Sequence, residues 1–252
     1  PSADPHLSEY LPERWQGRQW LSGFSGSMGT LVVTLDRAAV FADSRYWAQA
    51  EKELAGTGVE LVKIPTGAAT HYIEWIAEQL QPGQSLAIDG QVLSLSLAGA
   101  LRQAMQRAGI VMRTDVDVVQ AAWDGRPGLP VASIYEHLPP QAVVSRADKL
   151  AGVRAAMARA GASHHFISTV DDVAWLLNLR GADVDYNPVF LAHALLDASR
   201  VRLFVAAGKA SAELQARLAL DGVQVVDYAE APKALAALPA EAVLLLDPRR
   251  VT

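Results

Sequence analysis

The sequence predicts an α/β protein made of two duplicated domains, each a mixed sheet packed with helices. The first reason is an internal repeat: residues 19–26 (QWLSGFSG) are echoed by residues 174–181 (AWLLNLRG), with equal separation of the two tryptophans and of the two final glycines. The second is the alternation of β-rich runs with helical patterns in both halves, which implies helices packed on a sheet. A separation this long indicates duplicated domains, because solenoid repeats are only about 20 to 50 residues long.

The echo continues beyond the tryptophans. Leu35-Asp36-Arg37 lies between two apolar runs, as does Leu196-Asp197-Ala198-Ser199-Arg200. Residues 59–62 (VELV) match 223–226 (VQVV), and residues 85–89 (SLAID) match 243–247 (VLLLD). The separation drifts from one match to the next, as insertions and deletions in surface loops would make it do.

Turn residues and stop signals divide the first half into elements. Asp36-Arg37 between two β-rich runs indicates a hairpin. Gly56 and Gly109 end helical patterns, and Pro65 ends an apolar run. In order, we expect strands at 31–35 and 38–42, a helix at 44–55, a strand at 59–64, a helix at 71–80, a strand at 85–88, a helix at 93–108 and a strand at 110–113.

The second half begins after a proline-rich stretch. Prolines at 127, 130, 139 and 140 exclude a helix or central strand there, so we expect a linker at 125–144 between a domain at 1–124 and a domain at 145–252. Ser145-Arg146-Ala147-Asp148 has the form of a capping box and starts a helix that Gly161 ends. A strand at 165–168, a helix at 171–179, a hairpin of 189–196 with 201–206, and then helix, strand, helix and strand follow.

The first copy lacks the helix and strand that precede the second copy. Residues 1–4 (PSAD) correspond to residues 168–171 (STVD), which in the second copy come after its first helix and strand. We therefore expect a trimmed first domain and a longer parent protein, with another unit after Thr252.

Composition excludes several classes of function. The 252 residues are 51% hydrophobic and 19% charged, enough to bury a core in each half. A net charge of −5 argues against a nucleic-acid or anionic membrane surface, and no apolar run approaches the roughly 20 residues of a membrane span. The absence of cysteine rules out disulfides and thiol catalysis and fits a reducing, cytoplasmic compartment.

The densest cluster of small residues is Gly23-Phe24-Ser25-Gly26-Ser27-Met28-Gly29-Thr30. It is not a phosphate loop, because it has neither the lysine of a P-loop nor the dinucleotide spacing of glycines. A tight turn before a strand explains its glycines. That explanation does not account for two small hydroxyls, Ser25 and Ser27, at an exposed turn.

Asp43-Ser44-Arg45-Tyr46 lies where the hairpin's second strand meets the next helix. Asp43 or Ser44 can cap that helix, but Arg45 in a first turn opposes the helix dipole. A partner carboxylate or a ligand would explain it. The second copy has Ala206-Ala207-Gly208-Lys209 at this corner, so Asp43 and Arg45 have no counterparts there. Residues held by only one copy are the better candidates for function.

The chain offers no complete catalytic set. None of its six histidines has metal-site spacing, and no nucleophile elbow is present. The stretch Asn178-Leu179-Arg180-Gly181 is typical of a helix end with Arg180 in its last turn and Gly181 as cap, and Asn187-Pro188 is typical of a turn before an edge strand. Contact of Asn187 or Arg180 with a neighbouring domain is the alternative.

Taken together, five stretches resemble one family. They are residues 1–10 (PSADPHLSEY), residues 22–30 (SGFSGSMGT), Asp43-Ser44-Arg45-Tyr46, residues 172–181 (DVAWLLNLRG) and residues 186–190 (YNPVF). In this order and spacing the chain resembles the two N-terminal domains of the three-domain Xaa-Pro aminopeptidases, of the creatinase and prolidase superfamily. These enzymes carry their metal site in a third, pita-bread domain.

The resemblance implies a parent enzyme that removes the N-terminal residue from peptides with proline in second position. It implies a pair of divalent ions, commonly manganese, whose ligands lie in the catalytic domain, so this chain alone would be inactive. It also implies that Arg45 reaches the substrate, that Asp43 orients it, that Ser27 lines the same cleft, and that the enzyme is a homodimer. A freestanding binding or regulatory module, or an unrelated pair of ligand-binding domains, remains open from the residues themselves.

Overall fold

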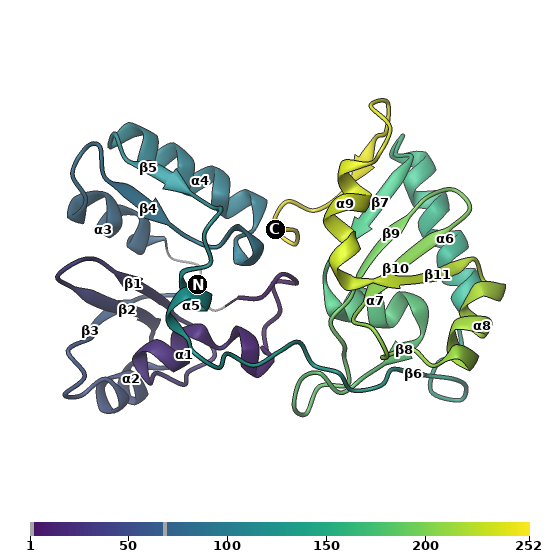
Figure 1. Ribbon diagram of the computed structural model, residues 1–252, viewed down its shortest axis with the longest axis horizontal. Helices are drawn as coiled ribbons and strands as arrows, with labels where there is room; N and C mark the ends of the chain where they lie inside the picture. The colour runs from purple at the N-terminus through teal and green to yellow at the C-terminus, as the bar shows by residue number, and fades with distance from the viewer. Residues whose placement is uncertain (1–2, 68–69) are drawn as a thin grey trace. The chain divides into compact units, whose positions relative to one another are not determined.

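The computed structural model describes residues 3–67 and 70–252, so the matches predicted for Pro1 and Ser2 lie outside the described residues. The chain divides into two compact units (Figure 1). Unit 1 is built mainly from Glu9–Pro127. Unit 2 comprises Gly128–Val251 together with the short segment His6–Ser8.

The described residues of unit 1 form two separate sheets. The first has the order β1-β2-β3, with β1 and β2 antiparallel and β2 and β3 parallel. The second pairs β4 with β5 in parallel. The elements in order are α1 (Gly17–Ser22), β1 (Thr30–Val33), β2 (Ala38–Asp43), α2 (Trp47–Glu53), β3 (Glu60–Ile64), α3 (His71–Gln79), β4 (Ser85–Ala87), α4 (Leu95–Arg107), β5 (Val111–Arg113) and α5 (Val118–Ala122).

The alternation of side chains along β2 creates a core on each face of the first sheet. Phe41 and Val32 pack with α3 and α4 in one cluster. Val40 and Ala42 pack with Phe24 and α2 in another. The two-residue period of a strand is what sends neighbouring side chains to opposite faces.

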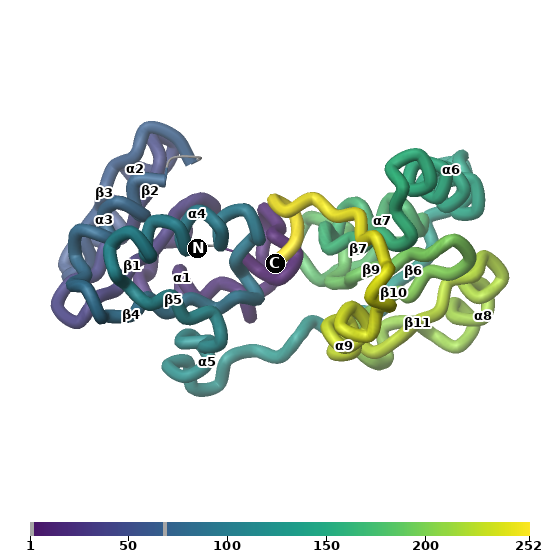
Figure 2. Tube along the Cα trace, turned by 90° about the horizontal axis from the view of Figure 1, so that it is seen from above, coloured from purple at the N-terminus to yellow at the C-terminus, as the bar shows by residue number. Residues whose placement is uncertain are grey.

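Unit 2 has one five-stranded mixed sheet in the order β11-β10-β9-β7-β12. Figure 2 shows its strands between α9 on one side and α6 and α7 on the other. A two-stranded ribbon pairs β6 with β8. The elements are β6 (Tyr135–Glu136), α6 (Arg146–Arg159), β7 (His164–Ile167), α7 (Val170–Leu177), β8 (Leu179–Arg180), β9 (His193–Leu196), β10 (Val201–Val205), α8 (Ala212–Leu220), β11 (Val223–Asp227), α9 (Ala231–Ala236) and β12 (Leu244–Leu245).

The strand registers align the two units residue by residue. Each hairpin has a four-residue loop closed in the same way: Thr34 N–H donates to Arg37 O at 2.8 Å, and Asp197 N–H donates to Arg200 O at 3.0 Å. Val33 therefore corresponds to Leu196, and the expected match of Leu35 with Leu196 is wrong by two residues. The match of residues 59–62 with 223–226 is confirmed, because β3 and β11 pair with β2 and β10 in the same register.

Two predicted helix ends also differ from the structure. The helix expected from Ser44 begins at Trp47, since the chain first makes a turn in which Tyr46 N–H donates to Asp43 O at 2.9 Å. The helix expected to reach Leu179 ends at Leu177, because Asn178 takes the left-handed conformation (φ 51°) and closes it. Arg180 therefore lies on β8, although its Nη1 still donates to Ala174 O of α7 at 3.0 Å.

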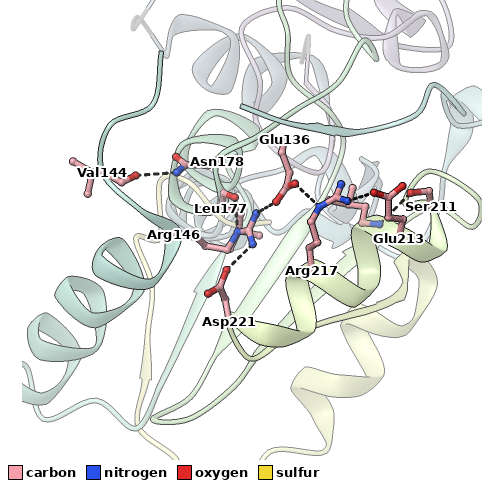
Figure 3. Close-up of polar contacts among 10 residues, drawn as sticks. Glu136, Val144, Arg146, Leu177, Asn178, Ser211, Glu213, Arg217 and Asp221 are labelled. Atoms are coloured by element: carbon pink, nitrogen blue, oxygen red, sulfur yellow. Dashed lines mark hydrogen bonds and ion pairs between the residues drawn. The ribbon is translucent and has the colours of Figure 1, made fainter. Parts of the chain in front are cut away.

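A charged network around Arg146 holds the start of α6 inside unit 2 (Figure 3). The Arg146 side chain is only 7% exposed and pairs with Glu136 at 2.8 Å and Asp221 at 2.7 Å. Its Nε donates to Leu177 O at 2.8 Å. Arg217 binds the other oxygen of Glu136 at 2.6 Å, so β6, α6, α7 and the end of α8 share one polar cluster. Ser145 caps α6 by accepting from Asp148 N–H at 3.1 Å, as the sequence predicts.

Candidate functional site

The candidate site starts at the corner after β2. Asp43, the last residue of β2, is buried, and its carboxylate accepts the backbone N–H of Arg45 at 3.1 Å. The same carboxylate takes two bonds from the Arg45 guanidinium, from Nε at 3.1 Å and from Nη2 at 2.8 Å. The Arg45 side chain is 64% exposed, whereas that of Asp43 is 4% exposed. A buried carboxylate therefore fixes one edge of an exposed guanidinium and leaves its Nη1 edge facing outward.

This pairing explains why Arg45 is tolerated at the corner. The sequence predicts Arg45 in the first turn of a helix, against the dipole, but Arg45 lies in the turn before α2. Hydrogen bonds from Arg45 hold the pKa of Asp43 below its ordinary value, and the same bonds raise the pKa of Arg45. Both groups thus stay charged through the neutral range.

The small-residue loop between α1 and β1 packs beside this corner. Arg18 of α1 holds it by donating to Gly26 O through Nη2 and to Gly29 O through Nη1 at 3.2 Å. A Cβ at Gly26 would lie 2.4 Å from Phe24 Cζ and 2.8 Å from Tyr46 Cδ1. Close approach to two aromatic rings, rather than a positive φ, is why this position needs glycine.

Ser27 and the corner are joined by a direct hydrogen bond. Ser27 Oγ lies 2.6 Å from the Tyr46 hydroxyl, and Tyr46 is the residue after Arg45. The Arg45 guanidinium also lies over the Tyr46 ring, 5.3 Å from its centroid. The structure therefore gathers all three predicted site residues, Asp43, Arg45 and Ser27, around Tyr46.

Sequence reasoning missed the residues that hold this arrangement. Ser25 binds Glu53 of α2 through both its backbone N–H (2.9 Å) and its hydroxyl (2.7 Å), which explains the second hydroxyl of the loop. Tyr46 belongs to the stretch Asp43-Ser44-Arg45-Tyr46, but its partner Ser27 is 19 residues away along the chain. Arg18 carries no local signal, since an arginine on a short helix usually faces solvent.

The chemistry available here is binding. An exposed guanidinium and two hydroxyls can recognise a carboxylate or a peptide carbonyl. Among the described residues, no three His, Asp or Glu side chains gather in a way that could hold a metal ion. Within the same residues, no helix is both long and apolar enough to cross a membrane.

Family profiles described as creatinase/prolidase N-terminal domain match the chain twice, over residues 10–119 and 125–252. The second match covers half of the chain. The chain belongs to the creatinase/prolidase N-terminal domain family. The resemblance noted in the sequence is confirmed, and so is the predicted fold of two duplicated α/β domains.

Relatives of this family are much longer than the chain. Aminopeptidase P2 of Arabidopsis thaliana is 36% identical over an alignment of 252 positions, which covers 98% of this chain and 35% of the relative. A probable Xaa-Pro aminopeptidase P of Botryotinia fuckeliana is 35% identical, over 91% of this chain and 36% of its own length. The chain thus spans about a third of the curated relatives it matches.

A solved structure shares the fold over the whole chain. The X-prolyl aminopeptidase of Caenorhabditis elegans, described as a cytosolic enzyme with a di-nuclear active site, superposes with a TM-score of 0.91. Its sequence is 25% identical, and the match covers 100% of this chain and 42% of that one.

Proposed function

We propose that this chain is the N-terminal part of an Xaa-Pro aminopeptidase that releases the first residue of peptides with proline in second position. The observation that supports this most is the similarity of nearly the whole chain to aminopeptidases P from a plant and from fungi. The catalytic centre, with a pair of divalent metal ions that we expect to be manganese, belongs to a part of such a protein outside this chain. On this proposal the 252-residue chain alone has no peptidase activity.

Within that protein, Arg45 contacts the peptide substrate and Asp43 orients it. The Nη1 donors of Arg45 make no hydrogen bond within the described residues, and Asp43 fixes the plane in which they point. Ser27 lines the same cleft beside Tyr46. Fixing an arginine in advance reduces the conformational entropy lost when a substrate binds.

Three further properties accompany the proposal. The enzyme works in the cytoplasm, as the related worm enzyme is described to do. It is a homodimer. It binds neither nucleic acid nor membrane, which a net charge of −5 supports.

The deciding experiment removes Arg45 from the longer protein that contains this chain. Arg45→Ala should lower kcat/KM on an Xaa-Pro peptide at least tenfold, or about 1.4 kcal/mol of transition-state binding. The matched control is Arg37→Ala, because Arg37 is also exposed and also makes a two-bond pair with a carboxylate, that of Glu60 at 3.0 and 2.8 Å. Arg37→Ala should leave kcat/KM within about twofold of the unchanged enzyme.

Equal kcat/KM for Arg45→Ala and the unchanged enzyme would remove Arg45 from the substrate site while leaving the peptidase assignment in place. Absence of any Xaa-Pro cleavage by the longer, metal-loaded protein would instead overturn the assignment and favour a binding or regulatory module.

A further inference from the structure

Asp43 determines which atoms of the Arg45 guanidinium remain for a ligand. Its carboxylate takes one hydrogen from Nε and one from Nη2, at 3.1 and 2.8 Å. An arginine side chain has five N–H donors, so three remain, two on Nη1 and one on Nη2. Within residues 3–67 and 70–252 these three donors make no hydrogen bond. Either a carbonyl or a carboxylate could accept from them, so the donors alone do not decide between the two.

The charges that act on Arg45 distinguish between these two ligands. The pKa of Arg45 is raised first by its hydrogen bonds to Asp43, then by the charge of Asp43, with a smaller part from the charge of Glu9. Two negative charges against one positive charge leave a local net charge of −1. A terminal carboxylate would be a third negative charge beside this single guanidinium, and like charges repel. An uncharged carbonyl does not meet this repulsion.

The other charged side chains around this corner balance one another. Behind the small-residue loop, Arg18 and Glu53 act on each other through their charges. On the neighbouring strand β3, Lys63 pairs with Glu51 at 2.5 Å. Each of these pairs has one cation and one carboxylate, so neither supplies a net positive charge that would attract a carboxylate to Arg45.

Tyr46 holds the guanidinium along one face, which favours binding of a neutral group. The Arg45 guanidinium lies 5.3 Å from the centroid of the Tyr46 ring. That ring packs edge-on against Phe24, with 6.2 Å between centroids, and its hydroxyl lies 2.6 Å from Ser27 Oγ. A carbonyl forms a weaker hydrogen bond with arginine than a carboxylate does, so it gains more from a donor whose position is fixed before binding.

We propose that Arg45 binds an uncharged main-chain carbonyl of the peptide substrate and discriminates against a terminal carboxylate at the same place. This inference rests on the proposed function, since it takes Arg45 to contact the substrate, and it names the group that is recognised. Asp43 then has a second role besides orienting Arg45, because its charge decides which end group the site accepts. A peptide whose last group beside Arg45 is an amide is a better substrate than the same peptide with a free carboxylate there.

The test uses Ala-Pro followed by one, two or three alanines, each peptide as the free acid and as the C-terminal amide. The enzyme is the longer protein that contains this chain. At the length that brings the last group to Arg45, kcat/KM for the acid should be at least about threefold below that for the amide. Asp43→Asn keeps the size of the side chain and removes its charge, so this deficit of the acid should disappear.

The matched control is Asp115→Asn. Asp115 makes the same two-bond pair with an exposed arginine two residues away, Arg113, at 3.0 and 2.8 Å. Its substitution should leave the ratio of acid to amide within about twofold of the unchanged enzyme. A merely structural effect of Asp43→Asn would lower kcat/KM for acid and amide alike and leave their ratio as it was.

A second measurement does not depend on peptidase activity. Inorganic phosphate, titrated calorimetrically into the metal-free longer protein, should show no binding that Arg45→Ala removes. Asp43→Asn should create a phosphate site that the double variant Asp43→Asn/Arg45→Ala lacks. Should Asp43→Asn fail to fold, the comparison of the unchanged protein with Arg45→Ala still decides the question.

The possible failures can be told apart. Acids cleaved better than amides, with an advantage that Arg45→Ala removes, would overturn the inference and leave Arg45 at the substrate. Equal cleavage of acid and amide at every length, or an unchanged ratio in Asp43→Asn, would also overturn it. Absence of all cleavage would overturn the proposed function instead, and phosphate binding by the unchanged protein through Arg45 would then overturn the inference separately.

Discussion

The corner after the second hairpin strand is built differently in the two units. In unit 1 it carries Arg45, exposed and paired with Asp43 of the same turn. In unit 2 the corresponding corner carries Lys209, which is fully buried and paired with Asp183, also fully buried. Both corners hold a cation and a carboxylate, but only in unit 1 is the cation exposed to solvent. The same fold position can therefore serve folding in one copy and remain available for binding in the other.

The buried pair of unit 2 organises two long connections. Asp183 also accepts Leu191 N–H at 2.7 Å, which fixes the loop leading into β9. Lys209 donates to Pro130 O at 3.3 Å through Nζ and accepts Ile134 N–H at 2.9 Å through its carbonyl. Residues 130–134, from the stretch that the sequence suggests as a linker, are thus bonded into unit 2.

Breaking the buried pair should have the largest effect. Lys209→Met leaves Asp183 as an uncompensated buried charge, which costs about 3–5 kcal/mol in the free energy of unfolding. Hydrogen exchange of β9 and β10 measures this within unit 2, since a two-unit chain need not unfold in one step. Exchange in β1 and β2 of unit 1 serves as the internal control. A loss below about 1 kcal/mol in unit 2 would mean that Lys209 is not important for folding, and the contrast between the corners would be lost.

The contrast between the two corners shows which features of the structure can be predicted from the sequence. The duplication, the order of strands and helices, and the absence of Asp43 and Arg45 from the second copy follow from residue patterns, because they depend on local periodicity and on comparing two matched segments. The burial of Lys209 does not follow. A lone lysine after a strand is usually solvated, and its partner Asp183 is 26 residues away along the chain.

The site shows the same division. Asp43 and Arg45 are two residues apart, so their pairing can be suggested from sequence. Two other contacts depend on how α1 packs beside the corner, which no local sequence pattern encodes. They are the hydrogen bond between Ser27 and Tyr46 and the hydrogen bonds that Arg18 donates to the loop. The predicted start of α2 differs from the structure for a related reason, since a turn and the first turn of a helix use the same capping residues.

The units also differ at the first position of β9 and β1, where a buried histidine in unit 2 should make stability depend on pH. His193 opens β9 where Thr30 opens β1. His193 is buried and stacks on His6, Phe166 and Tyr228, and its Nδ1 lies 2.9 Å from Ser168 Oγ. Burial first, and the neighbouring His6 second, hold the pKa of His193 well below its ordinary value.

A lowered histidine pKa makes unit 2 sensitive to acid below neutrality. The unfolded chain binds a proton near pH 6.5 that the folded unit does not, so stability is fully present above this pH and falls below it. One such proton limits the loss to about 1.4 kcal/mol per pH unit. Between pH 7.5 and pH 5.5, exchange protection should decrease in β9 and β10 and stay constant in β1 and β2. His193→Thr should make the unit 2 decrease smaller, whatever it does to stability at pH 7.5; an unchanged decrease would assign the effect to other groups.

The smallest expected effect concerns Arg45 itself. In the 252-residue chain, Arg45→Ala should change the free energy of unfolding by less than about 1 kcal/mol, because the Arg45 side chain is 64% exposed and buried Asp43 keeps the backbone N–H of residue 45 as a donor. Arg37→Ala, which breaks the comparable pair with Glu60, should give a similarly small change. Thermal unfolding of the two variants side by side measures this. A much larger loss for Arg45→Ala would mean that unit 1 uses its corner for folding, as unit 2 uses Lys209. Equal, small losses would leave Arg45 as a residue that folding does not require, the state expected of a side chain kept for a ligand.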